Sequence, residues 1–399
     1  MRTQRGASWC IFLSLIGLGL AGYLTVLHLG LLRGELLGGA VCGASGVLNC
    51  HVVTGSAFSS VLGMPLAMWG IIGYLTVIAL ALLARQSPEW LVHAMGLVFL
   101  LSLAFVIVDL VLLALMVFVI RVFCLFCLAT YVVNLLLLLV AARSLGRPWT
   151  EAVREAGTSL WAIWPSSLRP VTWFFWAVVL LGITGTVGLH AATLFVSRGT
   201  LGSVRQQIRE FITKQPRAAV DVTGDPMIGQ PQAKLHIVEF SDFLCPACQR
   251  ASKMNPILLA NHRRDAVLVF KHFPLDTMCN DKVTRMVHPG ACQIAAASEC
   301  AHLQGKFWLF HDKAFEDAER HKTANVDEIA RNIGLDAAGF RACLSSGQGM
   351  AAVKRDIAEA AKAKVVSTPT YVIGGIPVPG GFTPATFEDF VAVLKETGR

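Results

Sequence analysis

Long runs of apolar residues restrict what this chain can fold into more than any other feature of its sequence. Four of them extend over residues 9–32, 63–84, 90–120 and 122–142, and a fifth over about 171–196. Each reaches the roughly 20 residues with which a helix crosses the hydrocarbon core of a bilayer. Because backbone groups in lipid must find their hydrogen bonds within the segment, each run predicts a transmembrane helix.

The composition agrees with a membrane protein that carries a soluble part. Of the 399 residues, 54% are hydrophobic and only 15% are charged. Many of the basic residues behind the formal net charge of +8 lie beside the apolar runs, where membrane orientation accounts for them. Nucleic acid is therefore not predicted as a partner. The 11 cysteines indicate an oxidising compartment or a catalytic use of the thiols.

The arginines predict which ends of the spans face the cytoplasm. Arg2 and Arg5 precede the first span, Arg85 follows the second, and more arginines follow the fourth. By the positive-inside rule these segments are cytoplasmic. The polar loop 33–62, the start of the fourth span and everything after about residue 197 then lie outside.

Three cysteine pairs fall on that outer side. They are Cys42 with Cys50 in the polar loop, Cys124 with Cys127 at the start of the fourth span, and Cys245 with Cys248 in the soluble part. Two thiols three residues apart on a helix share a face, close enough to form a disulfide. The shared location of the three pairs predicts a relay of electrons through thiols and disulfides.

The residues after about 230 predict a soluble α/β domain. Strands are expected at 235–240 and 266–270, helical segments within 289–363, and another strand that ends at Ile373. Thr383 followed by proline is a typical start of a last helix.

Cys245 and Cys248 stand at a predicted strand-to-helix transition. At a helix start the first sulfur lies over free backbone N–H groups, which stabilise its thiolate, so Cys245 is the predicted nucleophile and Cys248 the resolving thiol. Half of a zinc site is the alternative, but it needs a second ligand pair at similar spacing, and no metal is predicted. Pro369, where a strand begins, is unusual for a ladder position, and a cis bond there would turn the preceding backbone toward the sulfurs.

These residues resemble the thioredoxin superfamily, and within it the DsbA-like periplasmic thiol oxidases. The resemblance covers about residues 225–397 and depends on the stretch 238–248, the Thr368–Pro369 loop and a helical insert between them. It implies that Cys245 and Cys248 catalyse thiol–disulfide exchange and that Pro369 is a cis proline. Glu239 or Asp242 would assist proton transfer, with a solvated surface role as the alternative for Asp242.

Four further cysteines of this domain predict two structural disulfides in an oxidising compartment. Sequence alone allows three pairings. We favour Cys279–Cys292 and Cys300–Cys343, with a resolving or shuttle role for one of them as the alternative.

The membrane part resembles the vitamin K epoxide reductase (VKOR) family over about residues 8–142. The resemblance rests on the segment 21–25 with His28, on Cys42, on 48–50, on Ser56, on 63–66, on Cys124 and Cys127, and on 129–131. It implies a four-helix bundle that holds a quinone, ubiquinone or menaquinone, beside the intramembrane cysteine pair.

The resemblance also implies roles for single residues. Cys42 would exchange with the soluble domain, Cys50 would attack Cys124, and Cys127 would face the quinone. Hydroxyl groups of Ser56 and Tyr131 match positions at the quinone pocket, where they can hydrogen-bond a ring carbonyl that gains negative charge. An aromatic residue of the membrane interface is the alternative for Tyr131.

Asp109 is the only acid within the four spans. An acid inside a membrane indicates function by default. The third run is long enough for Asp109 to lie near its exit instead, and both interpretations remain open.

The expected fold is an α-helical membrane four-helix bundle with a fifth linking transmembrane helix, followed by an α/β thioredoxin-like domain with a helical insertion. The expected domains are 1–145, a connector with the fifth helix and a linker at 146–230, and 231–399.

The expected function is quinone-dependent disulfide formation in reduced secreted proteins, without flavin or nucleotide, at a bacterial inner membrane whose lipid and quinone pool the enzyme shares. The thioredoxin-like domain would be periplasmic and would serve as the intramolecular redox partner of the membrane part. Two alternatives remain: quinone or epoxide reduction with the thioredoxin-like domain as electron donor, and a membrane-anchored thioredoxin-like binding module.

Overall fold

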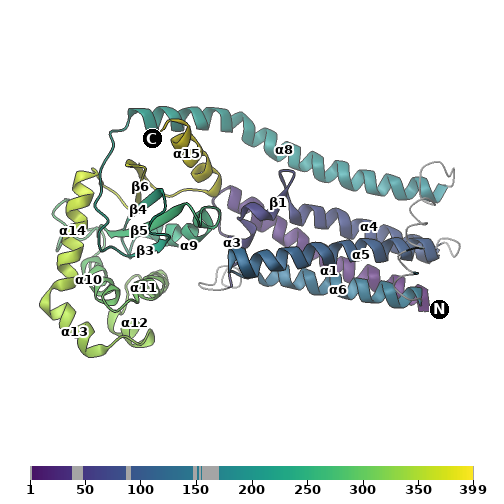
Figure 1. Ribbon diagram of the computed structural model, residues 1–399, viewed down its shortest axis with the longest axis horizontal. Coiled ribbons are helices and arrows are strands. Elements are labelled where there is room, and N and C mark those ends of the chain that lie inside the picture. Colours follow the sequence, from purple (N-terminus) through teal and green to yellow (C-terminus); the bar gives the residue numbers. More distant parts are fainter. Residues whose placement is uncertain are drawn as a thin grey trace. The chain divides into compact units, whose positions relative to one another are not determined.

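The computed structural model describes residues 2–37, 48–86, 91–146, 151, 154 and 170–398. The chain forms two compact units, Met1–Leu201 and Gly202–Arg399. Figure 1 shows a bundle of long helices in the first and a mixed sheet with helices in the second.

Four helices of the first unit lie side by side (Figure 1). They are α1 (Arg2–Leu32), α4 (Leu66–Gln86), α5 (Leu91–Ala114) and α6 (Leu125–Leu145). α5 continues into the π-helical segment η3 (Leu115–Ile120). Among the described residues, the four helices long and apolar enough to cross a membrane are Gln4–Leu32, Leu66–Gln86, Leu91–Ile120 and Leu125–Leu145. The four expected spans are thereby confirmed.

The bundle closes because α1 and α5 each pack against both α4 and α6. Its core contains large apolar side chains such as Phe99 and Leu137. Small residues let the helices approach, as is usual in membrane bundles. A Cβ at Gly17 would collide with the ring of Tyr74, and one at Gly73 would collide with Phe105.

Two predicted helix starts are corrected by a few residues. The second span begins at Leu66, after Ser60–Val61 (β1) pairs with Met64–Pro65 (β2) in a hairpin. The fourth begins at Leu125, because Cys124 has an extended backbone and serves as the N-cap. Cys124 and Cys127 therefore do not both lie within the helix.

The fifth expected span lies within α8 (Pro170–Lys214), one helix of 45 residues. Few of its side chains between residues 170 and 203 are described. A fifth crossing of the membrane remains a prediction.

The second unit is built on a five-stranded sheet in the order β3-β5-β4-β6-β7. The strands are β3 (Met227–Gly229), β4 (Leu235–Ser241), β5 (Ala266–His272), β6 (Thr370–Ile373) and β7 (Ile376–Pro379). β4 and β5 are parallel and the other pairs are antiparallel. Both central strands are almost wholly buried, as expected for strands covered on two faces.

Seven helices complete this unit within its described residues: α9 (Pro246–Ala260), α10 (Ala291–His302), α11 (Phe307–His321), α12 (Val326–Asn332), α13 (Ala337–Ser346), α14 (Gln348–Lys362) and α15 (Pro384–Glu396). α10 to α14 form the expected helical insert between β5 and β6. A core of aromatic side chains, among them Phe243, Phe270 and Phe307, joins the insert to the sheet. Thr383 caps α15 as predicted.

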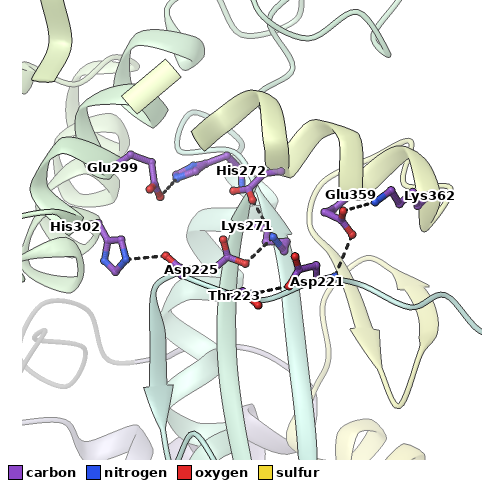
Figure 2. A network of polar contacts seen from close by, with 11 residues as sticks. Asp221, Thr223, Asp225, Lys271, His272, Glu299, His302, Glu359 and Lys362 are labelled. Atoms are coloured by element: carbon purple, nitrogen blue, oxygen red, sulfur yellow. Dashed lines mark hydrogen bonds and ion pairs between the residues drawn. The ribbon is translucent and has the colours of Figure 1, made fainter. Parts of the chain in front are cut away.

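Buried charges hold the segment before β3 on the domain (Figure 2). The ammonium group of Lys271, on β5, lies 2.6 Å from Asp225 and 2.9 Å from Asp356. The His302 ring shares a hydrogen bond of 3.1 Å with the carbonyl oxygen of Gly224. A buried ammonium group is tolerated only when it is paired in this way.

The expected linker up to residue 230 is wrong at its end, because Met227–Gly229 is an edge strand of the sheet. It pairs antiparallel with β5, and the Trp308 indole donates to the carbonyl of Met227 at 3.1 Å. Three residues are too few to show a strand pattern in a sequence.

Two disulfides lie in the helical part of the domain. They join Cys279 to Cys292 and Cys300 to Cys343, which is the pairing that we favoured among the three allowed. The separations are 13 and 43 residues. A longer closed loop restricts the unfolded chain more strongly.

We therefore expect the double variant Cys300→Ala/Cys343→Ala to lose about 4 kcal/mol of stability and Cys279→Ala/Cys292→Ala about 3 kcal/mol, from loop entropy. Denaturant unfolding of the two purified variants and the wild type measures this order. A smaller loss for the Cys300/Cys343 variant would contradict it.

Candidate active site

The soluble cysteine pair is positioned by the end of β4 and the start of α9. Cys245 is the N-cap of α9 and Pro246 is its first residue, where a missing N–H costs nothing. Cys248 lies in the first turn, fully buried, while Cys245 is 6% exposed. Both are free thiols, so this pair is in its reduced form.

The pKa values of the two thiols are driven apart. A hydrogen bond from Cys248, together with the backbone N–H groups of Cys248 and Ala247, lowers the pKa of Cys245 to about 5. Burial, with the nearby Cys245, raises the pKa of Cys248. A thiolate at neutral pH makes Cys245 the nucleophile, and stabilisation of the reduced form makes the disulfide an oxidant.

The loop before β6 reaches the same sulfur. The Thr368–Pro369 bond is cis, and the Cys245 thiol donates to the carbonyl oxygen of Thr368 at 3.5 Å. Pro369 in turn accepts a hydrogen bond from Gly380 through its carbonyl oxygen. The structure thus brings Pro369 beside the cysteine pair.

A buried carboxyl lies near the deeper thiol. Glu239, on β4, accepts a hydrogen bond of 2.6 Å from Asn255, and Asn255 accepts one of 2.7 Å from Tyr371. Complete burial raises the pKa of Glu239. A carboxyl that can be neutral near the operating pH is suited to exchange a proton with Cys248. Asn255 and Tyr371 were not identified from the sequence, because only the fold brings them to Glu239.

Asp242 is the hub of a second polar cluster. Its side chain is fully buried, which excludes the solvated surface role, and it accepts from the backbone N–H groups of Leu244 and Leu275 at 2.8 and 2.7 Å. It also shares a hydrogen bond of 2.8 Å with Nδ1 of His288. This bond raises the pKa of His288, with a further contribution from Cys245.

His288 was not identified from the sequence. It lies 43 residues after Cys245, and no local pattern marks it. Its interaction with Asp242 and with the charge of Cys245 raises its pKa and so favours the protonated ring.

The membrane cysteine pair has the same placement at a helix start. Cys124 is the N-cap of α6 and is disulfide-bonded to Cys127 in the first turn. The backbone N–H of Cys127 donates to the sulfur of Cys124 at 3.1 Å.

Cys50 is brought toward this pair by a backbone connection. Leu48 forms a parallel bridge with Phe123, and the N–H of Asn49 donates to the carbonyl of Phe123 at 2.9 Å. Asn49 also caps the short helix α3 (Cys50–Thr54), which packs against α6. Cys50 is a buried free thiol. Its predicted partner, Cys42, lies outside the described residues.

A cavity of about 510 Å³ lies inside the bundle and includes Cys127 in its lining. Ser56 and Tyr131, the two hydroxyl residues predicted for a quinone pocket, line it as well. Most of the other lining residues are apolar. An apolar cavity with few polar groups fits a quinone ring with its two carbonyl oxygens.

Three polar residues from three helices meet at the cavity. The Tyr74 hydroxyl donates to Oδ1 of Asn134, and Nδ2 of Asn134 donates to Oδ2 of Asp109, each at 2.8 Å. All three line the cavity. Tyr74 and Asn134 were not identified from the sequence, where nothing relates them to Asp109.

No group of three or more His, Cys, Asp or Glu side chains that could hold a metal ion occurs in the described part of the chain.

His288→Gln is expected to raise the pKa of Cys245 by about one unit, because a positive charge beside the thiolate is lost. The pH dependence of alkylation at Cys245, followed by peptide mass spectrometry, measures the shift. His321→Gln is the matched control, since His321 pairs with Asp317 on an exposed helix face. An unchanged alkylation profile in His288→Gln would refute the role of this histidine.

Glu239→Gln is expected to stabilise the protein at alkaline pH, and the gain should grow as the pH rises above the usual carboxyl range. The carboxyl has a raised pKa in the folded state, so it binds a proton that the unfolded state has lost. Wild-type stability therefore falls as pH rises from the unfolded pKa toward the folded one, whereas glutamine does not titrate. Denaturant unfolding of both proteins, in the same redox state, measures the free energy of unfolding at each pH. The two free energies should converge at about pH 4. A difference that stays constant across pH would contradict the raised pKa of Glu239.

Two family models match this chain. Residues 8–142 match the vitamin K epoxide reductase family, and residues 221–396 match a thioredoxin family. Among solved structures, a thioredoxin-like oxidoreductase from Silicibacter pomeroyi DSS-3 is 26% identical, with a TM-score of 0.37, and covers 44% of this chain and 94% of its own. Oxidised BdbD from Bacillus subtilis is 20% identical, with a TM-score of 0.38, over 46% of this chain and 99% of its own.

Curated relatives match only in part. The Na(+)/H(+) antiporter NhaA 3 of Salinispora tropica is 31% identical over 156 residues, which are 39% of this chain and 22% of that protein. The NhaA antiporter of Herminiimonas arsenicoxydans is 31% identical over 45% of this chain and 27% of its own length. The chain thus spans about a quarter of the curated relatives that it matches.

The family matches agree with the two units that the fold separates and with the cysteine pair that each contains. The chain joins a domain of the vitamin K epoxide reductase family, residues 8–142, to a thioredoxin-like domain, residues 221–396.

Proposed function

We propose that this protein forms disulfides in reduced secreted proteins and passes the electrons to a membrane quinone. The two family matches support the coarser statement that it is a thiol–disulfide oxidoreductase. The observation that carries the quinone step is the apolar cavity that contains Cys127, one sulfur of the membrane disulfide.

The first step is thiol–disulfide exchange at the soluble pair. A client dithiol reduces the Cys245–Cys248 disulfide and becomes a disulfide itself. The low pKa of Cys245 supports this direction, since it favours the reduced form of the pair. Glu239 accepts the proton of Cys248 when that thiol acts as the resolving nucleophile, and Pro369 holds the client strand beside Cys245.

The second step transfers the two electrons to the loop pair. The reduced Cys245/Cys248 pair reduces a Cys42–Cys50 disulfide, and the dithiol at Cys42 and Cys50 results. The Cys50 thiolate then attacks Cys124, which releases Cys127, and Cys42 displaces Cys124 from the mixed disulfide. The bridge between Leu48 and Phe123 supports this choice of nucleophile and target, because it leads Cys50 toward Cys124.

The third step restores the membrane disulfide. A quinone bound in the cavity would supply the acceptor for two electrons and two protons. Cys127 lines that cavity, and the hydroxyl group of Tyr131 orients the ring through a hydrogen bond. Ser56 also lines the cavity, but its hydroxyl group donates to the carbonyl oxygen of Val53 at 2.8 Å. Loss of two electrons and two protons from Cys124 and Cys127 returns the disulfide.

The cysteine relay requires a defined membrane location and domain arrangement. The protein belongs to a bacterial inner membrane, with the thioredoxin-like domain on the periplasmic side, as the arginines predict. The membrane domain is 1–145, the connector with a fifth crossing follows, and the thioredoxin-like domain begins before β3.

The test is reduction of ubiquinone or menaquinone by detergent-purified protein supplied with a reduced, cysteine-containing substrate. Cys127→Ala and Cys245→Ala should both lose quinone reduction, because each breaks the relay at a different step. Cys10→Ala is the control, as Cys10 is a buried free thiol outside the relay. Turnover that survives loss of Cys245 would contradict the relay, and absence of wild-type turnover with either quinone would contradict quinone dependence.

A further inference from the structure

The polar cluster of Asp109, Asn134 and Tyr74 has no role in the relay described above. Asp109 is the only acidic residue within the four candidate spans. It comes from α5, Asn134 from α6 and Tyr74 from α4, so three separate helices are arranged around one carboxyl.

The hydrogen bonds of the cluster form a chain of donors that ends at the carboxyl group of Asp109. Tyr74 donates to Asn134 and Asn134 donates to Oδ2 of Asp109. No described residue donates to the other carboxyl oxygen, Oδ1. A carboxyl in an apolar span is costly unless it has partners or a function. The cluster holds the carboxyl in place and leaves one oxygen for another purpose.

The same cavity contains Cys127 and this carboxyl. Oxidation of a dithiol to a disulfide releases two electrons and two protons, and reduction of a quinone to a quinol consumes both. Protons need a carrier in an apolar cavity, and a carboxyl serves as one when it is held within reach of the donor and the acceptor.

We propose that Asp109 carries one of these protons from the Cys124/Cys127 dithiol to a ring oxygen of the quinone. Asn134 and Tyr74 act as positioning residues for the carboxyl. As a carboxylate, Asp109 accepts one proton from the dithiol while the sulfurs form their bond, and it releases that proton to one ring oxygen. The other thiol proton passes to the second ring oxygen, so that dithiol and quinone become disulfide and quinol. Asp109 is unchanged after the turnover, and all electrons go from sulfur to quinone. This inference rests on the proposed function.

The alternative is a structural role, in which Asp109 only accepts the hydrogen bond from Asn134. Asp109→Asn separates the two, because its amide oxygen still accepts from Asn134 but cannot carry a proton. Asp109→Glu restores a carboxyl in the same place and should rescue proton transfer in part.

The experiment uses full-length protein in detergent, pre-reduced at Cys124 and Cys127, and mixed once with a soluble ubiquinone analogue. We expect the rate of quinone reduction to fall about 100-fold in Asp109→Asn, as for loss of a general acid–base group, and to recover partly in Asp109→Glu. Quinone affinity, measured by the quenching of tryptophan fluorescence, to which Trp69 in the cavity lining contributes, should change little. Reduction of the Cys124–Cys127 disulfide by substrate, measured by thiol alkylation, should be unchanged.

An infrared difference spectrum gives a readout that does not depend on turnover. Binding of the quinone analogue to wild-type protein should shift a carboxylate stretching band that Asp109→Asn lacks.

Several outcomes would overturn the assignment. One is a wild-type rate in Asp109→Asn, and another is a slow rate in that variant that is explained entirely by lost quinone affinity. The others are an Asp109→Glu variant that is no faster than Asp109→Asn, and a shifted carboxylate band that persists in Asp109→Asn. Failure of the wild type to reduce the quinone would instead overturn the proposed function, and this inference with it. The wild-type control therefore separates the two failures.

Discussion

A cysteine that caps the start of a helix is the arrangement on which both dithiol pairs depend. In the membrane pair the N–H of Cys127 donates to the sulfur of Cys124, whereas the Cys245 side chain of the soluble pair makes no such capping bond. Each first cysteine is an N-cap, and each second cysteine lies one turn later. The spacing of three residues therefore gives the same arrangement in the soluble domain and in the membrane bundle. It places a reactive sulfur at a helix start, where free backbone N–H groups are available.

The surroundings of each pair adapt this geometry to a different task. Around Cys245 the fold adds His288, which is held by Asp242, and the side chain of Thr368, and both favour the thiolate. Around Cys127 the fold adds an apolar cavity with few polar groups. The first environment is suited to exchange with proteins, and the second to a small apolar oxidant.

Each environment contains a carboxyl group, Glu239 or Asp109, and the two groups have similar hydrogen-bond partners. Glu239 is held by Asn255, which accepts from Tyr371, and Asp109 is held by Asn134, which accepts from Tyr74. In each case a tyrosine donates to an asparagine and the asparagine donates to the carboxyl. A carboxyl with a single donor of this kind stays in position without being locked in its charged form, and such a group can exchange protons.

The sequence by itself determined the four spans, the two Cys-x-x-Cys pairs, the proline loop and the helical insert, because each depends on local properties: the length of an apolar run, the spacing of thiols along a helix, or the backbone limits of proline. Ser56 and Tyr131 were predicted through a family resemblance and not from any local pattern. The partners of the reactive groups were decided by the tertiary structure alone. His288 reaches Asp242 across 46 residues, Asn134 reaches Asp109 across 25, and the Leu48–Phe123 bridge joins a loop to the start of a distant helix. The edge strand Met227–Gly229 likewise exists only because β5 offers it a partner. Such contacts form between side chains or backbones that packing brings together, and no periodicity in a single chain encodes which residues will meet.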